Sequence, residues 1–331
     1  MPLPNIWSEF QLANEFSCGV RNASTPFSQI RSLVRNDEEK KRNLLVAVVF
    51  FVSSGMSQAA TTGEGTEQQV GWTSAIHEAV WQNNVEKVKE MVEAKTVDLE
   101  AVVEDCTPLY LACLKGHTDV ARVLIEGGAK VDGDSPPIFA AAGKGNLELV
   151  NLLLAHKANP AAFSTQHAGC CGLHIAAEKN YVEVVEALLK ANVDVNIRSE
   201  KQKLTPLISA ACCGSLEAVK ALLKASADID AQSSTGNTAL MLAIDRGKID
   251  VALTLIESGA NLEIKGQKGW TALHNAASGG DKGYKEVAEA LIKHHASVDA
   301  LSETLLTPLH EGTVCSLCIN SLLFSFILML F

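Results

Sequence analysis

A four-residue phrase recurs eight times along this chain of 331 residues, and the recurrence limits the possible folds more than any other feature. The third residue of the phrase is always Leu or Ile, and successive third residues lie 33, 29, 35, 34, 33, 33 and 36 positions apart: Ile76, Leu109, Ile138, Leu173, Leu207, Leu240, Leu273 and Leu309. A period of this size is typical of architectures in which one supersecondary unit is stacked repeatedly. The repetition therefore predicts a stacked array.

Each phrase has the features of a helix start. In Thr205-Pro206-Leu207-Ile208 the threonine can cap a helix, and proline in the first turn costs no hydrogen bond. Small residues follow, such as Ala210-Ala211, and allow close approach between neighbouring helices. A Gly and a second apolar segment with helical spacing come next, and the segment ends at a stop such as Gly259-Ala260. Each unit is therefore predicted to contain two short helices and an extended loop.

The composition fits such an array. Apolar residues make up 47% of the chain, but Phe, Trp and Tyr only 5%. A single large core normally relies on aromatic side chains for buried area, whereas stacked units share a thin layer of Leu, Val, Ile and Ala. The net charge of −10 argues against a nucleic-acid reader, and nine cysteines are too few for a disulfide scaffold.

The phrase resembles the Thr-Pro-Leu-His signature of the ankyrin repeat family, and the resemblance covers residues 71–312 as seven complete repeats and a truncated eighth. It implies an all-α solenoid of helix-turn-helix units with β-hairpin finger loops. It also implies a non-catalytic module that binds other proteins. Histidines at the repeat position are expected to hydrogen-bond backbone between units, as in the family: His77, His174, His274 and His310.

Two intervals depart from the period, and the eighth unit is incomplete. In the 29-residue interval, residues 132–135 lead directly into Pro136-Pro137, which predicts a truncated finger between the second and third units. In the 36-residue interval, residues 279–283 predict three extra residues between the helices of the seventh unit. The eighth unit starts at Thr307-Pro308 and loses the pattern from Gly312 onward.

In the family, the two residues before the inter-helix Gly lie on the concave surface of the stack. Carried over to this chain, the second of these places holds four cations: Lys115, Lys144, Lys179 and Arg246. Such a row predicts a partner protein that contributes an acidic or phosphorylated segment. The alternative is that a cation simply suits a helix end with unpaired carbonyls.

Three tryptophans and one asparagine are further candidates. Trp72, Trp81 and Trp270 are expected to anchor a partner, since tryptophan is favoured at interfaces. Alternatively, Trp72 and Trp81 cap the end of the stack. Asn196 resembles the finger-base asparagine that is hydroxylated in some ankyrin domains, which predicts a hydroxylation position.

The sequence offers no sign of catalysis. It contains no P-loop, no Gly-x-Gly-x-x-Gly fingerprint opening a βαβ unit and no Gly-x-Ser-x-Gly elbow. Cys315 and Cys318 have the spacing of a redox or zinc pair, but no second pair accompanies them. We therefore expect no enzyme activity, no cofactor and no metal site.

The two ends differ from the repeats. Residues 1–70 are predicted to form an irregular extension, and its apolar stretch at 44–52 is too short to span a bilayer. This stretch imitates a signal peptide after an unusually long leader, so we expect the biological start to be Met56. Residues 313–331 form an apolar tail, interpreted as an alternative or mis-spliced terminus in preference to a tail anchor.

The leading interpretation is a cytoplasmic scaffold or adaptor. It would bind partner proteins through the concave face and the finger loops, without nucleic acid. Two alternatives remain open. One is the substrate receptor of a ubiquitin ligase that lacks its C-terminal box here. The other is a membrane adaptor anchored by residues 314–331.

Overall fold

The computed structural model describes residues 74–165, 167–279 and 282–314. These residues form seven pairs of helices followed by one further helix. The pairs are α4 (Ala75–Trp81) with α5 (Val85–Glu93), α6 (Pro108–Lys115) with α7 (Thr118–Glu126), α8 (Pro137–Lys144) with α9 (Leu147–Ala155), α10 (Gly172–Glu178) with α11 (Val182–Lys190), α12 (Pro206–Cys213) with α13 (Leu216–Lys224), α14 (Ala239–Asp245) with α15 (Ile249–Glu257), and α16 (Ala272–Ser278) with α17 (Lys282–Lys293). The last helix is α18 (Pro308–Val314).

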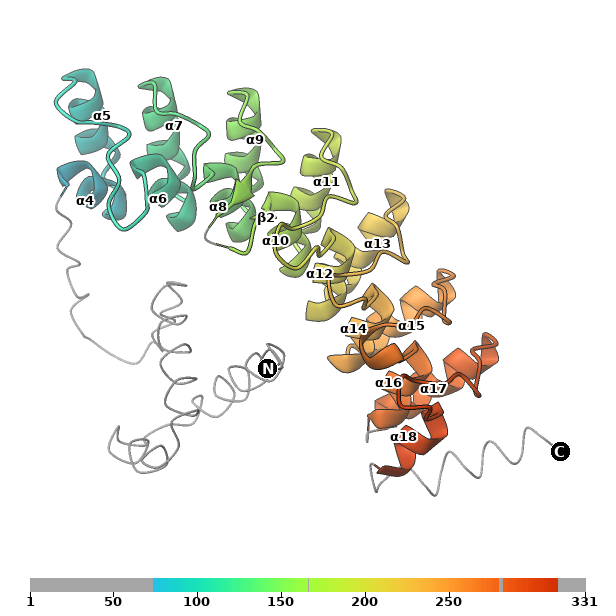
Figure 1. Ribbon diagram of the computed structural model, residues 1–331. Helices are drawn as coiled ribbons and strands as arrows, with labels where there is room; N and C mark the ends of the chain where they lie inside the picture. The colour runs from blue at the N-terminus through green and yellow to red at the C-terminus, as the bar shows by residue number, and fades with distance from the viewer. Residues whose placement is uncertain (1–73, 166, 280–281, 315–331) are drawn as a thin grey trace, which may run out of the picture. The chain divides into compact units, whose positions relative to one another are not determined.

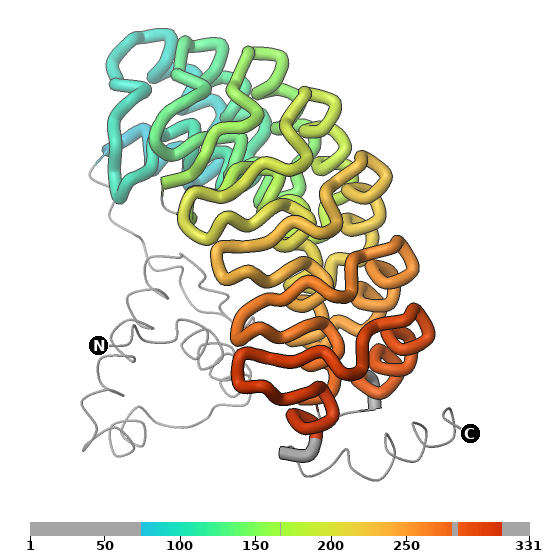
Figure 2. Tube along the Cα trace, turned by 45° about the vertical axis from the view of Figure 1, so that its right-hand side comes forward, coloured from blue at the N-terminus to red at the C-terminus, as the bar shows by residue number. Residues whose placement is uncertain are grey.

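The helix pairs stack in one file. Figure 1 shows the first helix of each pair along the inner side of a curve and the second helix along the outer side. The tube in Figure 2 shows the finger loops as a third layer of similar shape, repeated from unit to unit. Each first helix packs against the first helix of the next unit, from α4 to α18. The predicted all-α solenoid is confirmed.

The local signals explain where the first helices begin and end. Thr107, Thr205 and Thr238 each accept a hydrogen bond from the backbone N–H three residues later, which caps α6, α12 and α14. At the other end, Gly116 and Gly214 adopt φ of 82° and 83°, and this left-handed conformation closes the helix. The threonine caps are thus confirmed. The glycine stop predicted after the second helix is confirmed at Gly259, which follows α15 with φ of 84°.

The core is a thin layer between the two rows of helices. The third residue of the phrase is at most 5% exposed in the first seven units, whereas Leu309 of the eighth is 45% exposed. Small residues fill the remaining core positions, for example Ala112, Ala176 and Ala210, which are fully buried. This is the aromatic-poor core that the composition predicts.

Histidines tie neighbouring units together. The Nε2–H groups of His77, His174 and His274 donate to the backbone carbonyls of residues 106, 204 and 306, at 3.0, 2.9 and 3.1 Å. In His274 the other ring nitrogen, Nδ1, accepts from the N–H and O–H of Thr271 at 3.2 and 2.9 Å. These bonds fix the neutral tautomer of His274 and confirm the expected role of His77, His174 and His274. Nδ1 of His310 accepts from the N–H and O–H of Thr307 in its own unit, at 3.3 and 2.8 Å, and its expected bond to a neighbouring unit stays a prediction.

The fingers contain less β-structure than expected. Among the described residues, the only paired strands are β1 (Phe163–Ser164) and β2 (Cys170–Cys171), antiparallel, with Phe163 opposite Cys171. Other fingers are narrow turns closed by backbone bonds, such as the 2.8 Å bond from the Gly266 N–H to the Trp270 carbonyl. The expected hairpin fingers are therefore present as narrow turns, and among the described residues only one of them is long enough to pair as two strands.

The two departures from the period have different structural outcomes. The connection from α7 to α8 comprises only residues 127–136, against residues 94–107 between α5 and α6, which confirms the truncated finger. In the seventh unit, by contrast, α17 has 12 residues where α13 and α15 have nine. The sequence predicted the extra residues between the two helices, and that prediction is wrong, because they lengthen α17 instead. A longer helix pairs its own backbone groups, which a longer turn would not.

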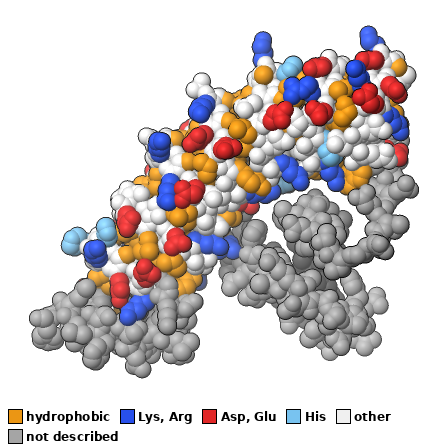
Figure 3. Space-filling model, turned by 180° about the vertical axis from the view of Figure 1, so that it is seen from behind, with side chains coloured by type: hydrophobic (Ala, Val, Ile, Leu, Met, Phe, Trp, Pro, Cys, Tyr) orange, Lys and Arg blue, Asp and Glu red, His pale blue; other side chains and the backbone are white. Residues whose placement is uncertain are grey.

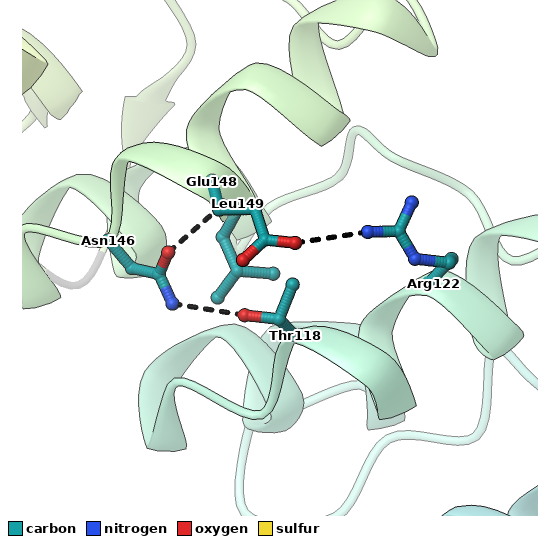
Figure 4. A network of polar contacts seen from close by, with 5 residues as sticks. All are labelled: Thr118, Arg122, Asn146, Glu148 and Leu149. Atoms are coloured by element: carbon teal, nitrogen blue, oxygen red, sulfur yellow. Dashed lines mark hydrogen bonds and ion pairs between the residues drawn. The ribbon is translucent and has the colours of Figure 1, made fainter.

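Polar contacts also join the outer helices. Figure 4 shows the Arg122 guanidinium of α7 3.1 Å from the Glu148 carboxylate of α9, while the Asn146 amide donates to the Thr118 hydroxyl at 3.2 Å. The Asn146 carbonyl in turn accepts from the Leu149 N–H and caps α9. Because Arg122 and Glu148 are largely exposed, their ion pair adds little stability; the cap contributes more.

A row of side-chain acceptors links successive loops after the outer helices. Each acceptor takes a hydrogen bond of 2.7 to 2.9 Å from a backbone N–H of the next unit. We call this row the loop ladder, and its members are Glu100, Asp132, Asn196, Asp230 and Glu263. Ala161 stands at the same place in the third unit, since its N–H is held by Asn159 as the Asn196 N–H is held by Asp194. Ala161 offers no acceptor, so the ladder is interrupted there.

We expect Ala161→Asn to raise the free energy of unfolding by about 0.5–1 kcal/mol, because the new side chain can accept from the Asp194 N–H. Conversely, Asn196→Ala should lower it by a similar amount. Urea unfolding measures both changes. Ala162→Asn is the matched control, since its side chain lies outside the ladder position. An equal gain from Ala162→Asn would show that the ladder is not the cause.

None of the helices in the described ranges has the length and apolar character needed to cross a bilayer. Residues 1–73 and 315–331 lie outside these ranges. Three assignments made there stay predictions: the apolar stretch at 44–52, the start at Met56 and the apolar tail. The bounds of the N-terminal extension and of the repeat domain stay predictions as well.

Candidate functional site

The four predicted cations occupy equivalent places on the inner side of the stack. Lys115 and Lys144 end α6 and α8, while Lys179 and Arg246 follow the last residues of α10 and α14. The three lysines are exposed and Arg246 is half-buried. We call the surface formed by the C-terminal ends of the first helices the inner face.

Lys115 is held over the predicted anchor Trp81. Its Nζ lies 3.1 Å from the centroid of the Trp81 ring, a close cation–π contact between the first and second units. Trp81 is half-buried at the end of α4. Trp81 therefore already orients a cation of the inner face.

Lys179 connects the third and fourth units. Its Nζ donates to the Gly143 carbonyl at 2.8 Å, in the last turn of α8, where the helix dipole favours a cation. Although Lys179 is exposed, partial desolvation by the neighbouring protein lowers its pKa, and the charge of Lys144 lowers it further, while Glu178 opposes both. This contact supports the interpretation of the lysines as helix-end cations. The Lys144 contribution also shows that positive charges are crowded here.

His117 lies close enough to Lys115 and Lys144 to feel the charges of both lysines. Its pKa is lowered by burial, against a hydrogen bond with the Trp81 backbone, and the charges of Lys115 and Lys144 lower it as well. Lys144 thus acts together with Lys115 on His117 and also acts on Lys179, and we call the three lysines the basic patch. An anion bound at the basic patch would relieve the repulsion between them.

The inner face is mixed in charge beyond the fourth unit. Asp245 directly precedes Arg246, and desolvation raises the pKa of Asp245 to about 6 in spite of the opposing charges of Arg246 and Lys268. The carboxylate next to Arg246 weakens the positive potential there. The predicted row of four cations is therefore a patch of three lysines and a separate arginine. The repeat register, which only aligns equivalent positions, does not reveal this distinction.

The remaining predicted residues lie elsewhere. Trp270 is half-buried in its finger and stacks on His274, with ring centroids 6.3 Å apart. The Asn196 carbonyl accepts from the Asp228 N–H at 2.8 Å, as a member of the loop ladder. Trp72 falls outside the described residues. The interface roles of the tryptophans and the hydroxylation of Asn196 stay predictions.

The face seen from behind carries charges of both signs. Figure 3 shows acidic and basic side chains interspersed with apolar ones over that face. Within the described ranges, His, Cys, Asp and Glu side chains do not gather in groups of three or more that could hold a metal ion. The basic patch is therefore the best candidate for a binding site.

Family profiles match most of the chain. The profile described as "Ankyrin repeats (3 copies)" matches residues 56–135, 76–164, 129–199 and 173–266, and the profile "Ankyrin repeat" matches residues 268–303.

Curated relatives and solved structures agree with the profiles. The chain is 29% identical over 267 residues to human Ankyrin repeat and SOCS box protein 16, covering 71% of this chain and 58% of that protein. It is 31% identical over 201 residues to human B-cell lymphoma 3 protein, covering 57% and 44%. The chain thus spans about half the length of these relatives.

The crystal structure of the human ASB11 ankyrin repeat domain matches with a TM-score of 0.59 and 29% identity, covering 68% of this chain and 99% of that one. The profiles cover nearly all of residues 56–303, and the described helices repeat the same paired arrangement. The chain belongs to the ankyrin repeat family.

Proposed function

We propose that this ankyrin-repeat scaffold binds an acidic or phosphorylated segment of a partner protein on its inner face, with the basic patch as the principal contact. The observation that carries the proposal is the crowding of Lys115, Lys144 and Lys179 in a chain of net charge −10. Lysines that repel one another gain most when an anion lies between them. No catalytic role is part of the proposal.

The competing explanation is that these lysines only neutralise helix ends. The outer helices provide a matched test, because Lys190, Lys224 and Lys293 lie in the last turns of α11, α13 and α17. These three lysines also lie at the C-terminal ends of helices, but they do not lie on the inner face. Reversing either set of three changes the net charge equally.

We expect Lys115→Glu, Lys144→Glu and Lys179→Glu together to weaken binding of the full chain to phosphoserine-containing and Glu-rich peptide arrays by about tenfold or more at low salt. The triple reversal at 190, 224 and 293 should leave the binding nearly unchanged. Fluorescence anisotropy of the strongest peptides, measured at two salt concentrations, gives the affinities. Equal losses in the two triple variants, or none in the first, would contradict the proposal.

A second candidate is the substrate receptor of a ubiquitin ligase. It is favoured by the similarity to Ankyrin repeat and SOCS box protein 16, whose name includes a SOCS box, and to Ankyrin repeat and SOCS box protein 3 of Bos taurus, at 32% identity over 184 residues. Sequencing transcripts beyond the codon for His310 tests it. A reading frame that completes the eighth repeat and adds such a box would support this candidate, and transcripts that all end as here would count against it.

We also propose a cytoplasmic location. The six described cysteines are free thiols, which fits a reducing compartment. Cell fractionation tests this proposal. Membrane association that resists carbonate would support the tail-anchored alternative instead.

A further inference from the structure

Gly143 lies in the middle of the basic patch, at a place where the fold does not require glycine. It belongs to α8 and has an ordinary helical backbone, unlike Gly145 two residues later. A Cβ added to Gly143 would lie 3.5 and 3.9 Å from Cγ1 and Cγ2 of Ile175, which is ordinary van der Waals contact. Glycine inside a helix destabilises it relative to alanine. Another reason for this glycine must therefore be sought on the surface.

The missing side chain leaves part of Ile175 exposed. Ile175 is half-buried, whereas the equivalent residues in the other units from the second to the seventh are at most 8% exposed: Leu111, Ala140, Ser209, Leu242 and Asn275. For each of these five, the preceding unit carries a side chain at the place of Gly143: Trp81, Leu114, Glu178, Cys212 and Asp245. The exposed aliphatic surface of Ile175 thus coincides with the one glycine at this place.

Two lysines of the basic patch flank the exposed surface of Ile175. Lys144 directly follows Gly143 at the end of α8. Lys179 lies four residues after Ile175, so the two side chains share a face at the end of α10. The Lys179 Nζ donates to the Gly143 carbonyl at 2.8 Å, which holds this cation beside the glycine. An aliphatic surface therefore lies between two exposed positive charges.

We propose that Gly143 and Ile175 form an apolar subsite of the inner face, which receives an aliphatic side chain of the acidic partner segment. This inference rests on the proposed function and names the partner more closely. The partner carries a residue such as Leu or Val directly beside Glu, Asp or phosphoserine. Its aliphatic side chain packs on Ile175 in the space that a side chain at Gly143 would fill, while Lys144 and Lys179 contact the neighbouring acidic groups.

The probes for this proposal are two peptides that differ at one position. One is a Glu-rich peptide with a single central Leu, and the other has Gly in place of that Leu. We expect the natural full chain to bind the Leu peptide about tenfold more tightly, because burying the aliphatic side chain adds affinity. Added salt should weaken both peptides and leave their ratio nearly unchanged, since screening acts on the charges. Fluorescence anisotropy measures the affinities.

Filling the subsite should remove the preference for Leu. Gly143→Leu should bring the affinity for the Leu peptide close to that for the Gly peptide, which itself should hardly change. Gly143→Ala should reduce the preference in part and raise the urea midpoint of unfolding, because alanine favours the helix. Weaker Leu-peptide binding in a more stable chain excludes unfolding as the cause. Cys212→Leu is the matched control: it adds leucine at the equivalent place of the fifth unit, and the preference should persist.

The results that would overturn the proposal are specific. Equal affinities of the natural chain for the two peptides would do so, as would a Leu preference that survives Gly143→Leu. A preference that is lost in Leu114→Ser but kept in Gly143→Leu would place the apolar contact at Leu114, which is 39% exposed in the second unit, and would also overturn it.

Failure of the proposed function gives a different result. In that case neither peptide binds, or the triple reversal of the basic patch leaves both affinities unchanged. Either result overturns the proposed function and the subsite together. Loss of both affinities in the triple reversal, with equal binding of the two peptides to the natural chain, would overturn the subsite alone.

Discussion

Replacing Gly145 by alanine should lower the free energy of unfolding by about 2–5 kcal/mol, from backbone strain and from overpacking. Gly145 closes α8 at φ of 70°, a conformation that disfavours any side chain. A Cβ there would also lie 2.8 to 2.9 Å from Cγ, Cδ1 and Cδ2 of Tyr181. These atoms form the base of the ring, and Tyr181 is the N-cap residue of α11, so relief of the contact requires a different χ1 of Tyr181 or a shift of the start of that helix.

Gly116 is the matched control for this substitution. It closes α6 at φ of 82°, and a Cβ there would meet no atom within 4 Å. Gly116→Ala should therefore cost only the backbone strain, about 1–2 kcal/mol. Urea unfolding followed by circular dichroism measures both losses, and a Tyr181→Ala background should reduce the cost at Gly145 to that at Gly116. Equal losses at the two glycines in the natural background would show that Tyr181 yields freely.

The stability of the stack should fall as the pH drops below 6.5. Burial lowers the pKa of His174 and His274 from the ordinary 6.5, despite their hydrogen bonds to the backbone carbonyls of Leu204 and Leu306. A proton added to Nδ1 would also face N–H donors, those of Cys171 and Thr271. The folded state thus resists protonation that the unfolded chain accepts.

The sign follows from linkage. Above 6.5 neither state binds the protons and the full stability is present. As the pH falls from 6.5 through the lower folded-state pKa, the unfolded chain gains protons first and stability is lost. Each of these histidines contributes at most about 1.4 kcal/mol per pH unit to the dependence of the unfolding free energy on pH.

Unfolding free energies measured between about pH 7.5 and 5 test this expectation. His274→Gln should be less stable than the natural chain at the upper end, and the difference should shrink toward the lower end because the titrating group is gone. His294→Gln, at an exposed position of the loop after α17, is the control. A pH dependence that is unchanged in His274→Gln would contradict the assignment.

The helix boundaries are predictable from sequence because their causes are local. Thr205 caps α12 within three residues, and Gly214 closes it in a conformation that few other residues adopt. The inner-face positions of Lys115, Lys144 and Lys179 follow from the same register. The repeat pattern therefore predicts those features that depend only on residues within one unit.

Contacts between units are much less predictable. Gly145 and Tyr181 are separated by a whole repeat, so nothing near either residue indicates that they touch. The missing ladder acceptor at Ala161 has no local signature either. For the site, the register predicts the positions of Lys115 and Lys179, but neither the Trp81 ring beneath Lys115 nor the carbonyl that holds Lys179. These contacts depend on how one unit rests on the next.

Each unit stacks only on its immediate neighbours, and this has a consequence for folding. Among the described residues, the side-chain hydrogen bond that reaches furthest along the chain joins Ala218 to Asn180, 38 positions apart. The entropy of closing such a loop is therefore the same for every unit, however many units the array contains. Contact order stays low as the array lengthens, so added or removed repeats change its length without slowing the search for native contacts.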